Sequence, residues 1–326
     1  MGQLLFDAHS DYKINIKYHD FPDPLKKQFF EKTGMKLEEI SFSSWALFKD
    51  IVTCGMPSFH ITRRRNLQRS DEIKYKIFLM RAALEVDDDG YIIVSDKIKY
   101  LDSSERAFIS YYIGMFMTKV VSRVIFNYDY LVHFGIVEQY KKVVRGSSEP
   151  DLVGFNNKSD EYSLFEAKGR KKIKTSMITY AKNQLNSVGY ISGMKPLVRV
   201  VCVSHPIKEG KRITCSMYDP QLKENINPPV SKGELLYLYY LPIYELIIEN
   251  GAGEASCSFP LDENGEHKMR IHIEMPKKLF EFFSENPVFS ELRDKDSQII
   301  ETISSLSEND KDDLLNFKVS EFEDND

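Results

Sequence analysis

Two short apolar runs lie on either side of a polar segment in the middle of the chain, at 151–155 and 162–167. Runs of this length, rich in aromatic and aliphatic residues and separated by turn-forming residues, predict a β-hairpin. Strand side chains alternate between two faces, so Glu166 and Lys168 point to the same face. Asp151 begins the first strand. If the two strands pair, two carboxylates and one ammonium group meet at one end of a sheet.

A long helix is predicted before this hairpin, over residues 101–126. Asp102 and Glu105 have the spacing of a capping box, which marks the first turn of a helix. Between 107 and 117 the residues are apolar almost all round. This pattern indicates a helix that is deeply buried rather than one that lies on a surface.

Further elements follow the same alternation of patterns. An apolar strand is predicted at 130–134, a helix at 173–188 and strands at 196–204 and 211–218. The order helix, strand, hairpin, helix, strand predicts an α/β (α+β) core with a mixed central sheet flanked by helices. N-terminal and C-terminal extensions complete the chain.

The first hundred residues predict a separate α+β region. Residues 12–18 alternate like a half-buried strand, and a helix is expected from Asp23-Pro24 to Gly34. Helical spacing continues over 37–52 and 71–86, and a strand is expected at 91–95. Three adjacent arginines precede the last helix, and they either grip phosphates or lie in a solvated loop; they are Arg63, Arg64 and Arg65.

The region from 220 to 308 is rich in aromatic residues. Ser231 and Glu234 form a second capping-box pattern before a stripe of tyrosine, leucine and isoleucine side chains that contains Pro242. Residues 267–275 alternate like a strand, and a helix is expected after Pro276. The aromatic stripe is either core or an interface with a second copy of the chain or with an ATPase or helicase partner.

Charge is distributed unevenly along the chain. Residues 309–326 hold seven acidic and two basic residues, which accounts for the whole net charge of −5. The remainder is neutral, so the overall charge does not exclude a nucleic-acid partner. We expect the acidic tail to be disordered or to serve as a short docking segment.

Several classes of protein are disfavoured by the sequence. The four cysteines are far apart and form no CxxC pair, so neither a disulfide framework nor a zinc site is expected. The first residues lack the pattern of a signal peptide. The longest uncharged apolar run, 107–118, is too short to span a bilayer. We therefore expect a cytoplasmic protein without a membrane partner.

The predicted meeting of Asp151 and Glu166 has an electrostatic cost. Two carboxylates about 4 Å apart repel by roughly 4 kcal/mol at an effective dielectric constant near 20, and Lys168 offsets only part of this. They must share a proton, recruit a cation or bind a metal. Mg²⁺, or Mn²⁺ in its place, suits such a site and accepts phosphate oxygens as further ligands, which predicts metal-assisted phosphodiester hydrolysis. The alternative is a surface hairpin with solvated charges.

The same residues carry a resemblance to a known family. Pro150-Asp151, the fourteen residues 152–165 and then Glu166-Ala167-Lys168 resemble the signature of the PD-(D/E)xK nuclease superfamily, the fold of many restriction endonucleases, resolvases and phage-defence nucleases. Short strings of this kind recur at Glu72–Lys74, but there the surrounding spacing is helical. The resemblance covers about residues 101–219 and implies a restriction-endonuclease-like core.

The resemblance also implies roles for individual residues. Asp151 and Glu166 would hold the metal with the backbone carbonyl of Ala167. Lys168 would orient or deprotonate the attacking water and stabilise the negative charge that develops on the phosphate. In this superfamily the preceding helix often supplies a third acid, which makes Glu105 a candidate ligand, although capping is its alternative role.

Two further groups of candidates lie on and before the helix that follows the hairpin. A glutamine on this helix faces the active site in some branches, so Gln184 is a candidate, with a bond to nearby backbone as the alternative. Basic residues without an intervening acid follow the second strand, and they would bind the phosphate backbone: Arg170, Lys171, Lys172 and Lys174.

These inferences combine into one prediction of function. Four regions are expected: an N-terminal region at 1–100 that binds nucleic acid or a partner, a nuclease core at 101–219, an aromatic-rich region at 220–308 and an acidic tail at 309–326. The resemblance implies a Mg²⁺-dependent deoxyribonuclease, an endonuclease rather than an exonuclease, in prokaryotic restriction or phage defence. The alternative is a catalytically silent nucleic-acid-binding or assembly module of a multi-subunit defence complex.

Overall fold

The chain divides into two compact units in a computed structural model. The first unit contains residues 1–57 and 76–229, and the second contains residues 58–75 and 230–326. The residues that the structure describes are 3–4, 11–19, 38–54, 69–135, 149–156, 162–188, 196–219, 231–251, 253–260, 269–286, 295–307 and 315–321.

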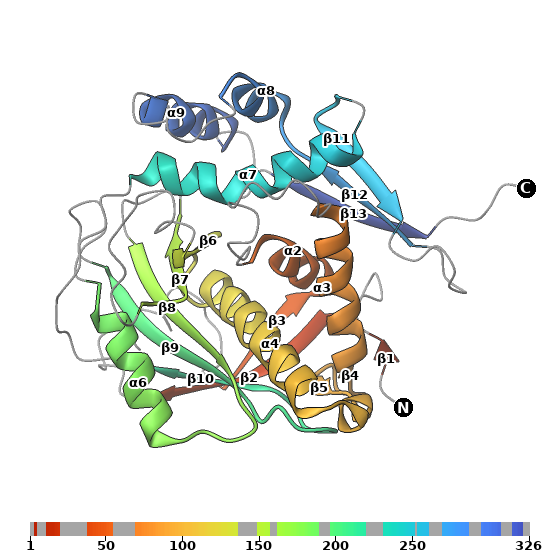
Figure 1. The fold of residues 1–326 in the computed structure, drawn as a ribbon, viewed down its shortest axis with the longest axis vertical. Coiled ribbons are helices and arrows are strands. Elements are labelled where there is room, and N and C mark those ends of the chain that lie inside the picture. The colour runs from red at the N-terminus through yellow and green to blue at the C-terminus, as the bar shows by residue number, and fades with distance from the viewer. Residues whose placement is uncertain are drawn as a thin grey trace, which may run out of the picture. The chain divides into compact units, whose positions relative to one another are not determined.

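A curled, mixed sheet of seven strands forms the centre of the first unit (Figure 1). Two neighbouring pairs, β2 with β10 and β8 with β9, are parallel, and the other neighbours are antiparallel. The predicted α/β class with a mixed central sheet is confirmed. In spatial order the strands are β3 (Glu39–Ser43), β2 (Asp11–His19), β10 (Thr214–Tyr218), β9 (Val198–His205), β8 (Tyr162–Gly169), β7 (Leu152–Phe155) and β6 (Tyr130–His133).

Strands from the N-terminal region belong to this same sheet. β2 is the strand predicted at 12–18, and it pairs in parallel with β10, about two hundred residues later in the sequence. β3 pairs with β2 on its other side. The boundary predicted at residue 100 is therefore crossed by one continuous sheet.

The helix predicted over 37–52 is wrong in its first part. Residues 39–43 form β3, because Ile40 and Phe42 alternate with more exposed neighbours and are buried against β2. The hydroxyl of Ser43 then accepts a hydrogen bond from the Ala46 N–H at 3.2 Å, and this N-cap starts α2 (Ser44–Thr53).

A second helix is likewise shorter than its pattern suggested. α3 (Arg69–Ala83) replaces the helix predicted to end at residue 86, because the last three residues form β4 (Leu84–Val86). β4 lies between β1 (Gln3–Leu4) and β5 (Ile92–Val94) in a small three-stranded sheet. A short 3₁₀ helix, η2 (Asp96–Tyr100), follows β5.

Two helices pack against the strands that carry the candidate site. α4 (Ser103–Val124) contacts β8 and β9, and α6 (Thr175–Asn186) contacts the same two strands. α4 begins with the predicted capping box, in which Asp102 and Glu105 each bond to the other's backbone. Twelve of its residues between 109 and 122 are buried. The deep burial predicted for residues 107–117 is found from residue 112 onward, but Phe108 and Tyr111 are exposed.

Glycines set how closely α4 approaches the end of β8. A Cβ atom added to Gly114 would lie 2.6 Å from the Gly169 backbone nitrogen, and one added to Gly169 would overlap the Ser110 carbonyl. The helix and strand backbones therefore touch directly. This contact fixes the turn of α4 around Ser110 beside the residue that follows Lys168.

The second unit combines a helical layer with a three-stranded antiparallel sheet (Figure 1). The capping box predicted at Ser231 and Glu234 is confirmed, and Pro242 lies inside one continuous helix. Most of the aromatic stripe, including Tyr237 and Tyr240, is buried, so the structure supports the core alternative for it. The elements are α7 (Lys232–Asn250), β11 (Ser256–Pro260), β12 (Met269–Glu274), α8 (Lys277–Glu285), α9 (Asp296–Ser307) and β13 (Asn316–Glu321).

Part of the acidic tail is ordered, contrary to the expectation of disorder. Residues 316–321 form β13, which pairs with β12 over six residues. The strand sequence alternates two apolar residues, Phe317 and Val319, with polar ones, a pattern that the prediction from composition passed over. Within the described residues, no helix is long and apolar enough to cross a bilayer.

Candidate functional site

The hairpin places Asp151 and Glu166 opposite each other. β7 and β8 are antiparallel, and their last paired residues at this end are Leu152 and Phe165, so the next position on each strand is Asp151 and Glu166. The Asp151 N–H donates to Glu166 Oε2 at 3.1 Å, and the Ala167 N–H donates to Asp151 Oδ2 at 2.8 Å. Each carboxylate is therefore held by the backbone of the other's segment. The two carboxylates meet at one end of the sheet, as predicted from the strand pattern.

Lys168 completes the predicted group. Its ammonium bonds to Glu166 Oε1 and lies 3.6 Å from Asp151 Oδ2. Alternation along β8 brings Glu166 and Lys168 to one face, where they meet Asp151. The Glu166 side chain is completely buried, whereas Asp151 and Lys168 retain 20% and 15% exposure, so solvent or a substrate can reach the group from the side of Asp151.

Burial makes the charge on Glu166 costly. Loss of solvation and then the nearby charge of Asp151 raise the pKa of the Glu166 carboxyl to about 8, although Lys168 and the Asp151 N–H oppose this rise. Lys168 alone therefore does not compensate for two facing carboxylates. An additional cation at this position would favour the charged form of Glu166.

The pattern of backbone hydrogen bonds along β8 indicates the direction of the Ala167 carbonyl. Arg170 exchanges both of its backbone hydrogen bonds with the β9 side, through Ser204 and Ile207. The backbone N–H and C=O groups of successive residues in a strand point to opposite neighbouring strands. Those of Ala167 therefore point away from β9, as the hydrogen bond from its N–H to Asp151 shows. By the same alternation, its carbonyl oxygen is expected on the side of β8 where Asp151 lies.

These oxygens form a donor set that fits Mg²⁺ or Mn²⁺. Among the described residues, Asp151 Oδ1 accepts no hydrogen bond, and no site gathers three or more His, Cys, Asp or Glu side chains. A divalent ion here would therefore take two carboxylates and the Ala167 carbonyl, and would fill its shell with water or phosphate oxygens. This is the arrangement that Mg²⁺ prefers in proteins.

Gln184 of α6 holds the segment that enters the site. Its Nε2 group donates to the Glu149 carbonyl at 2.9 Å, two residues before Asp151. This bond fixes the orientation of the amide, whose oxygen Oε1 is buried without a hydrogen-bond partner in the part of the chain that the structure describes. Gln184 thus does bond to nearby backbone. Its buried Oε1 atom is left able to accept a hydrogen bond close to the Pro150-Asp151 segment.

Glu105 is used as a cap. Its Oε2 accepts from the Asp102 N–H at 2.9 Å in the exposed first turn of α4. None of the contacts of the described residues joins it to Asp151 or Glu166. The structure therefore supports the capping alternative for this residue rather than metal binding.

The basic segment after β8 is exposed at the end of the strand that carries Lys168. It consists of Arg170, Lys171, Lys172 and Lys174. The guanidinium of Arg170 donates to the Gly169 carbonyl at 2.8 Å, while the three lysines extend into solvent. The other predicted cluster, Arg63, Arg64 and Arg65, lies outside the described residues.

No protein-family model, curated protein or solved structure matches this chain.

Two residues near the site were not found from the sequence. Burial and then the charge of Asp151 raise the pKa of the Tyr111 hydroxyl, so the hydroxyl end of this α4 side chain is shielded from solvent, although 40% of the residue's surface is exposed. Burial lowers the pKa of His133, and the charge of Asp151 opposes this shift. The Nδ1 atom of His133 accepts from the Gly135 N–H at 3.1 Å. The only sequence signal for Tyr111 is its place on the predicted helix, next to Ser110 and three residues before Gly114.

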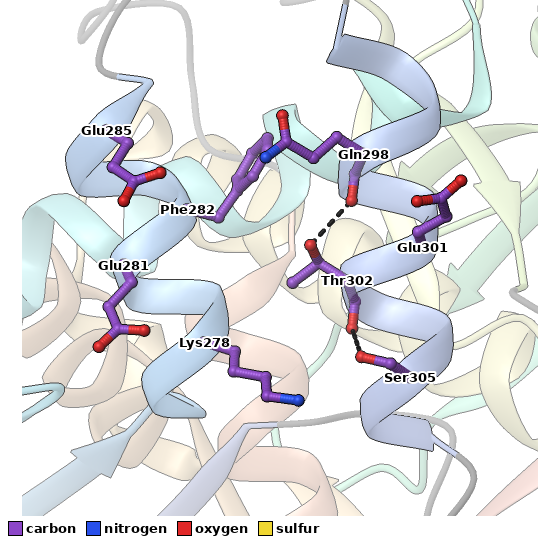
Figure 2. A pocket seen from close by; sticks show the side chains of 8 residues that line it. All are labelled: Lys278, Glu281, Phe282, Glu285, Gln298, Glu301, Thr302 and Ser305. Carbon is purple, nitrogen blue, oxygen red and sulfur yellow. Dashed lines mark hydrogen bonds between the residues drawn. The ribbon is translucent and has the colours of Figure 1, made fainter.

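A groove in the second unit offers a contrast to this site. It encloses about 420 Å³ between α8 and α9, and Figure 2 shows Phe282 and Gln298 between the two helices. Its three carboxylates, those of Glu281, Glu285 and Glu301, are exposed. Because these carboxylates are solvated, their charge costs little and requires no bound cation, so this groove is not the candidate for catalysis.

Proposed function

We propose that this protein is a Mg²⁺-dependent nuclease that hydrolyses phosphodiester bonds in DNA. The observation that carries the proposal is the mutual clamp of Asp151 and Glu166 with Lys168 against both carboxylates. The hairpin that holds them, within a mixed sheet packed against helices, supports a restriction-endonuclease-like core of the PD-(D/E)xK type.

The proposed chemistry divides between the metal and the chain. A bound Mg²⁺ would supply Lewis acidity toward a phosphate oxygen and lower the pKa of a water molecule. Asp151, Glu166 and the Ala167 carbonyl hold the binding position. Lys168 orients the attacking water and stabilises the negative charge that develops on the phosphate. Gln184 keeps the Glu149–Asp151 segment in place through its bond to the Glu149 carbonyl.

The proposed setting is the cytoplasm of a prokaryote, in restriction or phage defence. All four cysteines are buried and free, which agrees with a reducing compartment. The setting itself rests on the likeness of the site to that superfamily, and docking of a second copy or of an ATPase or helicase through the second unit remains a prediction.

Incubation of the purified chain with circular single-stranded DNA and with double-stranded plasmid DNA tests the proposal, and cleavage of either substrate supports it. Cleavage is expected with Mg²⁺ or Mn²⁺ and not with EDTA. Lys168→Ala should reduce the rate at least about a hundredfold, because the group that orients water and stabilises charge is lost. The matched control is Lys97→Ala, which removes an exposed lysine of η2 and should cleave like the wild type.

Two outcomes would contradict the proposed activity. Equal cleavage by wild type and Lys168→Ala would mean that another site or a contaminant acts. DNA binding without cleavage under every metal condition would instead favour the silent nucleic-acid-binding module.

A further inference from the structure

Two aromatic side chains are exposed on one side of α4. Phe108 and Tyr111 retain 41% and 40% of their accessible surface, whereas the next turns of the helix are largely buried. Residues three apart on a helix are neighbours on its surface. The two rings therefore form one exposed aromatic patch, which we call the α4 platform.

The α4 platform lies beside the candidate site. Tyr111 is near enough to Asp151 and Glu166 for their charges to affect its hydroxyl group. Ser110, between the two aromatic residues, has its backbone against Gly169, the residue after Lys168. The contact between backbones leaves this turn of the helix little freedom to shift relative to the site.

Both rings are held in place by a buried neighbour. Tyr112 is 7% exposed, and its ring meets Phe108 edge-on at a centroid distance of 4.8 Å and Tyr111 at 5.4 Å. Edge-to-face packing of this kind is favourable and orders the rings before anything binds. A ligand that stacks on them therefore loses little free energy in ordering the protein.

Basic residues gather around the same end of α4. Arg106, two residues before Phe108 on α4, and Lys171, two residues after Gly169, are both exposed, and the Gly169 backbone lies against Ser110 of the same helix. Lys171 belongs to the segment that follows Lys168. Basic side chains thus flank the α4 platform at the end of β8 and at the helix start, where the exposed acids Asp102 and Glu105 also lie.

An aromatic surface combined with basic residues is the chemistry that binds single-stranded nucleic acid. The basic groups attract the phosphates, and the exposed rings accept the faces of unpaired bases. A double helix hides these faces by stacking its own base pairs. Phosphate attraction alone would explain the lysines but would leave two ordered, exposed aromatic rings unexplained.

We propose that Phe108 and Tyr111 stack unpaired bases, and that the substrate of the candidate site is single-stranded nucleic acid. This inference rests on the proposed nuclease function and adds the class of substrate. The strand would lie with its bases on the α4 platform and its phosphates toward Lys171 and the Asp151–Glu166 pair.

Binding without metal tests the α4 platform separately from catalysis. Fluorescence anisotropy in EDTA compares a single-stranded oligothymidine with an abasic strand of equal length and charge. The wild type should bind the oligothymidine about tenfold more tightly than the abasic strand. The double variant Phe108→Ala/Tyr111→Ala should lose this preference and bind both strands with nearly the same affinity.

A matched pair of exposed aromatic residues provides the control. Tyr75 and Phe78 of α3 have the same spacing and similar exposure, at 46% and 40%. Tyr75→Ala/Phe78→Ala should keep the preference for bases. If the alanine variant of the α4 platform is poorly folded, Phe108→Leu/Tyr111→Leu keeps the apolar volume but removes the aromatic faces, and it should lose the preference as well.

The outcomes separate this inference from the proposed activity. Equal affinity of the wild type for oligothymidine, abasic strand and duplex would overturn the proposal that the α4 platform stacks bases, even if DNA is cleaved at Asp151 and Glu166. An unchanged preference in both platform variants would also overturn it. If the preference for oligothymidine is present and depends on Phe108 and Tyr111 but no DNA is cleaved, base stacking on the α4 platform is supported and the proposed nuclease activity is contradicted.

Discussion

Glu166→Gln is expected to reduce Mg²⁺-dependent cleavage about a thousandfold and to make the metal-free protein more stable at pH 8.5. Cleavage falls because the amide is a neutral and much weaker ligand for Mg²⁺. Stability rises because the amide has nearly the same shape but carries no charge in a site where the Glu166 side chain is fully buried. Loss of function together with gain of stability distinguishes this site from an ordinary structural ion pair.

The stability effect should depend on pH in a defined direction. The pKa of Glu166 is about 8 in the folded chain, against an ordinary value of 4.5. Between these values the folded chain binds more protons than the unfolded chain, so the free energy of unfolding of the wild type falls as the pH rises. Above pH 8 Glu166 is ionised in the folded chain too, and the stability that its protonated form provides at low pH is lost. The glutamine variant has no such group, and its advantage should reach about 1–3 kcal/mol at pH 8.5 and be small at pH 4.5.

Urea unfolding in EDTA at the two pH values measures this difference, and a DNA cleavage assay measures the loss of activity. Glu281→Gln on α8 is the matched control, because its carboxylate is exposed and should change neither quantity. A Glu166→Gln protein that still cleaves DNA at the wild-type rate, or that is less stable than the wild type at pH 8.5, would contradict this reading of the site.

Gly169→Ala should cause the largest loss of stability of any small substitution near the site. The new Cβ would overlap the Ser110 carbonyl, and both partners are backbone, so no side chain can rotate away. Relief requires α4 to move from the end of β8. We expect a decrease of about 3 kcal/mol or more in the free energy of unfolding, at the upper end of the range for overpacked sites.

Gly210→Ala provides a comparison in which only the backbone is strained. Gly210 has a φ of +64°, but its Cβ would meet only Asp96 Oδ1 at 3.7 Å. A loss of about 1–2 kcal/mol is expected from the left-handed conformation alone. Urea unfolding of the two variants checks the order. If Gly169→Ala were as stable as the wild type, α4 would not rest on the end of β8 as described.

Much of the site could be predicted from the sequence because its geometry is local. Asp151 and Glu166 are joined by one short hairpin, and the period of two along β8 determines which side chains share a face. The capping boxes of α4 and α7 were equally readable, since each depends on residues three positions apart.

The errors arose where a local pattern was ambiguous or a contact was distant. Five residues are too few to distinguish the period of a strand from that of a helix, so β3 was taken as the start of α2. The parallel pairing of β2 with β10 joins distant parts of the chain, and nothing local indicates it. Tyr111 was read as core because its neighbours are apolar, although its own side chain is exposed beside the site.

The central claim is that Asp151 and Glu166 together capture one divalent ion. Titration of the chain with Mn²⁺, followed by the electron paramagnetic resonance signal of the free ion, tests it most directly. The account predicts one Mn²⁺ bound per wild-type chain, binding at least about a hundredfold weaker in Asp151→Asn and in Glu166→Gln, and unchanged binding in the groove variant Glu281→Gln/Glu285→Gln. A wild-type chain that binds no Mn²⁺, or site variants that bind it as tightly as the wild type, would contradict the claim.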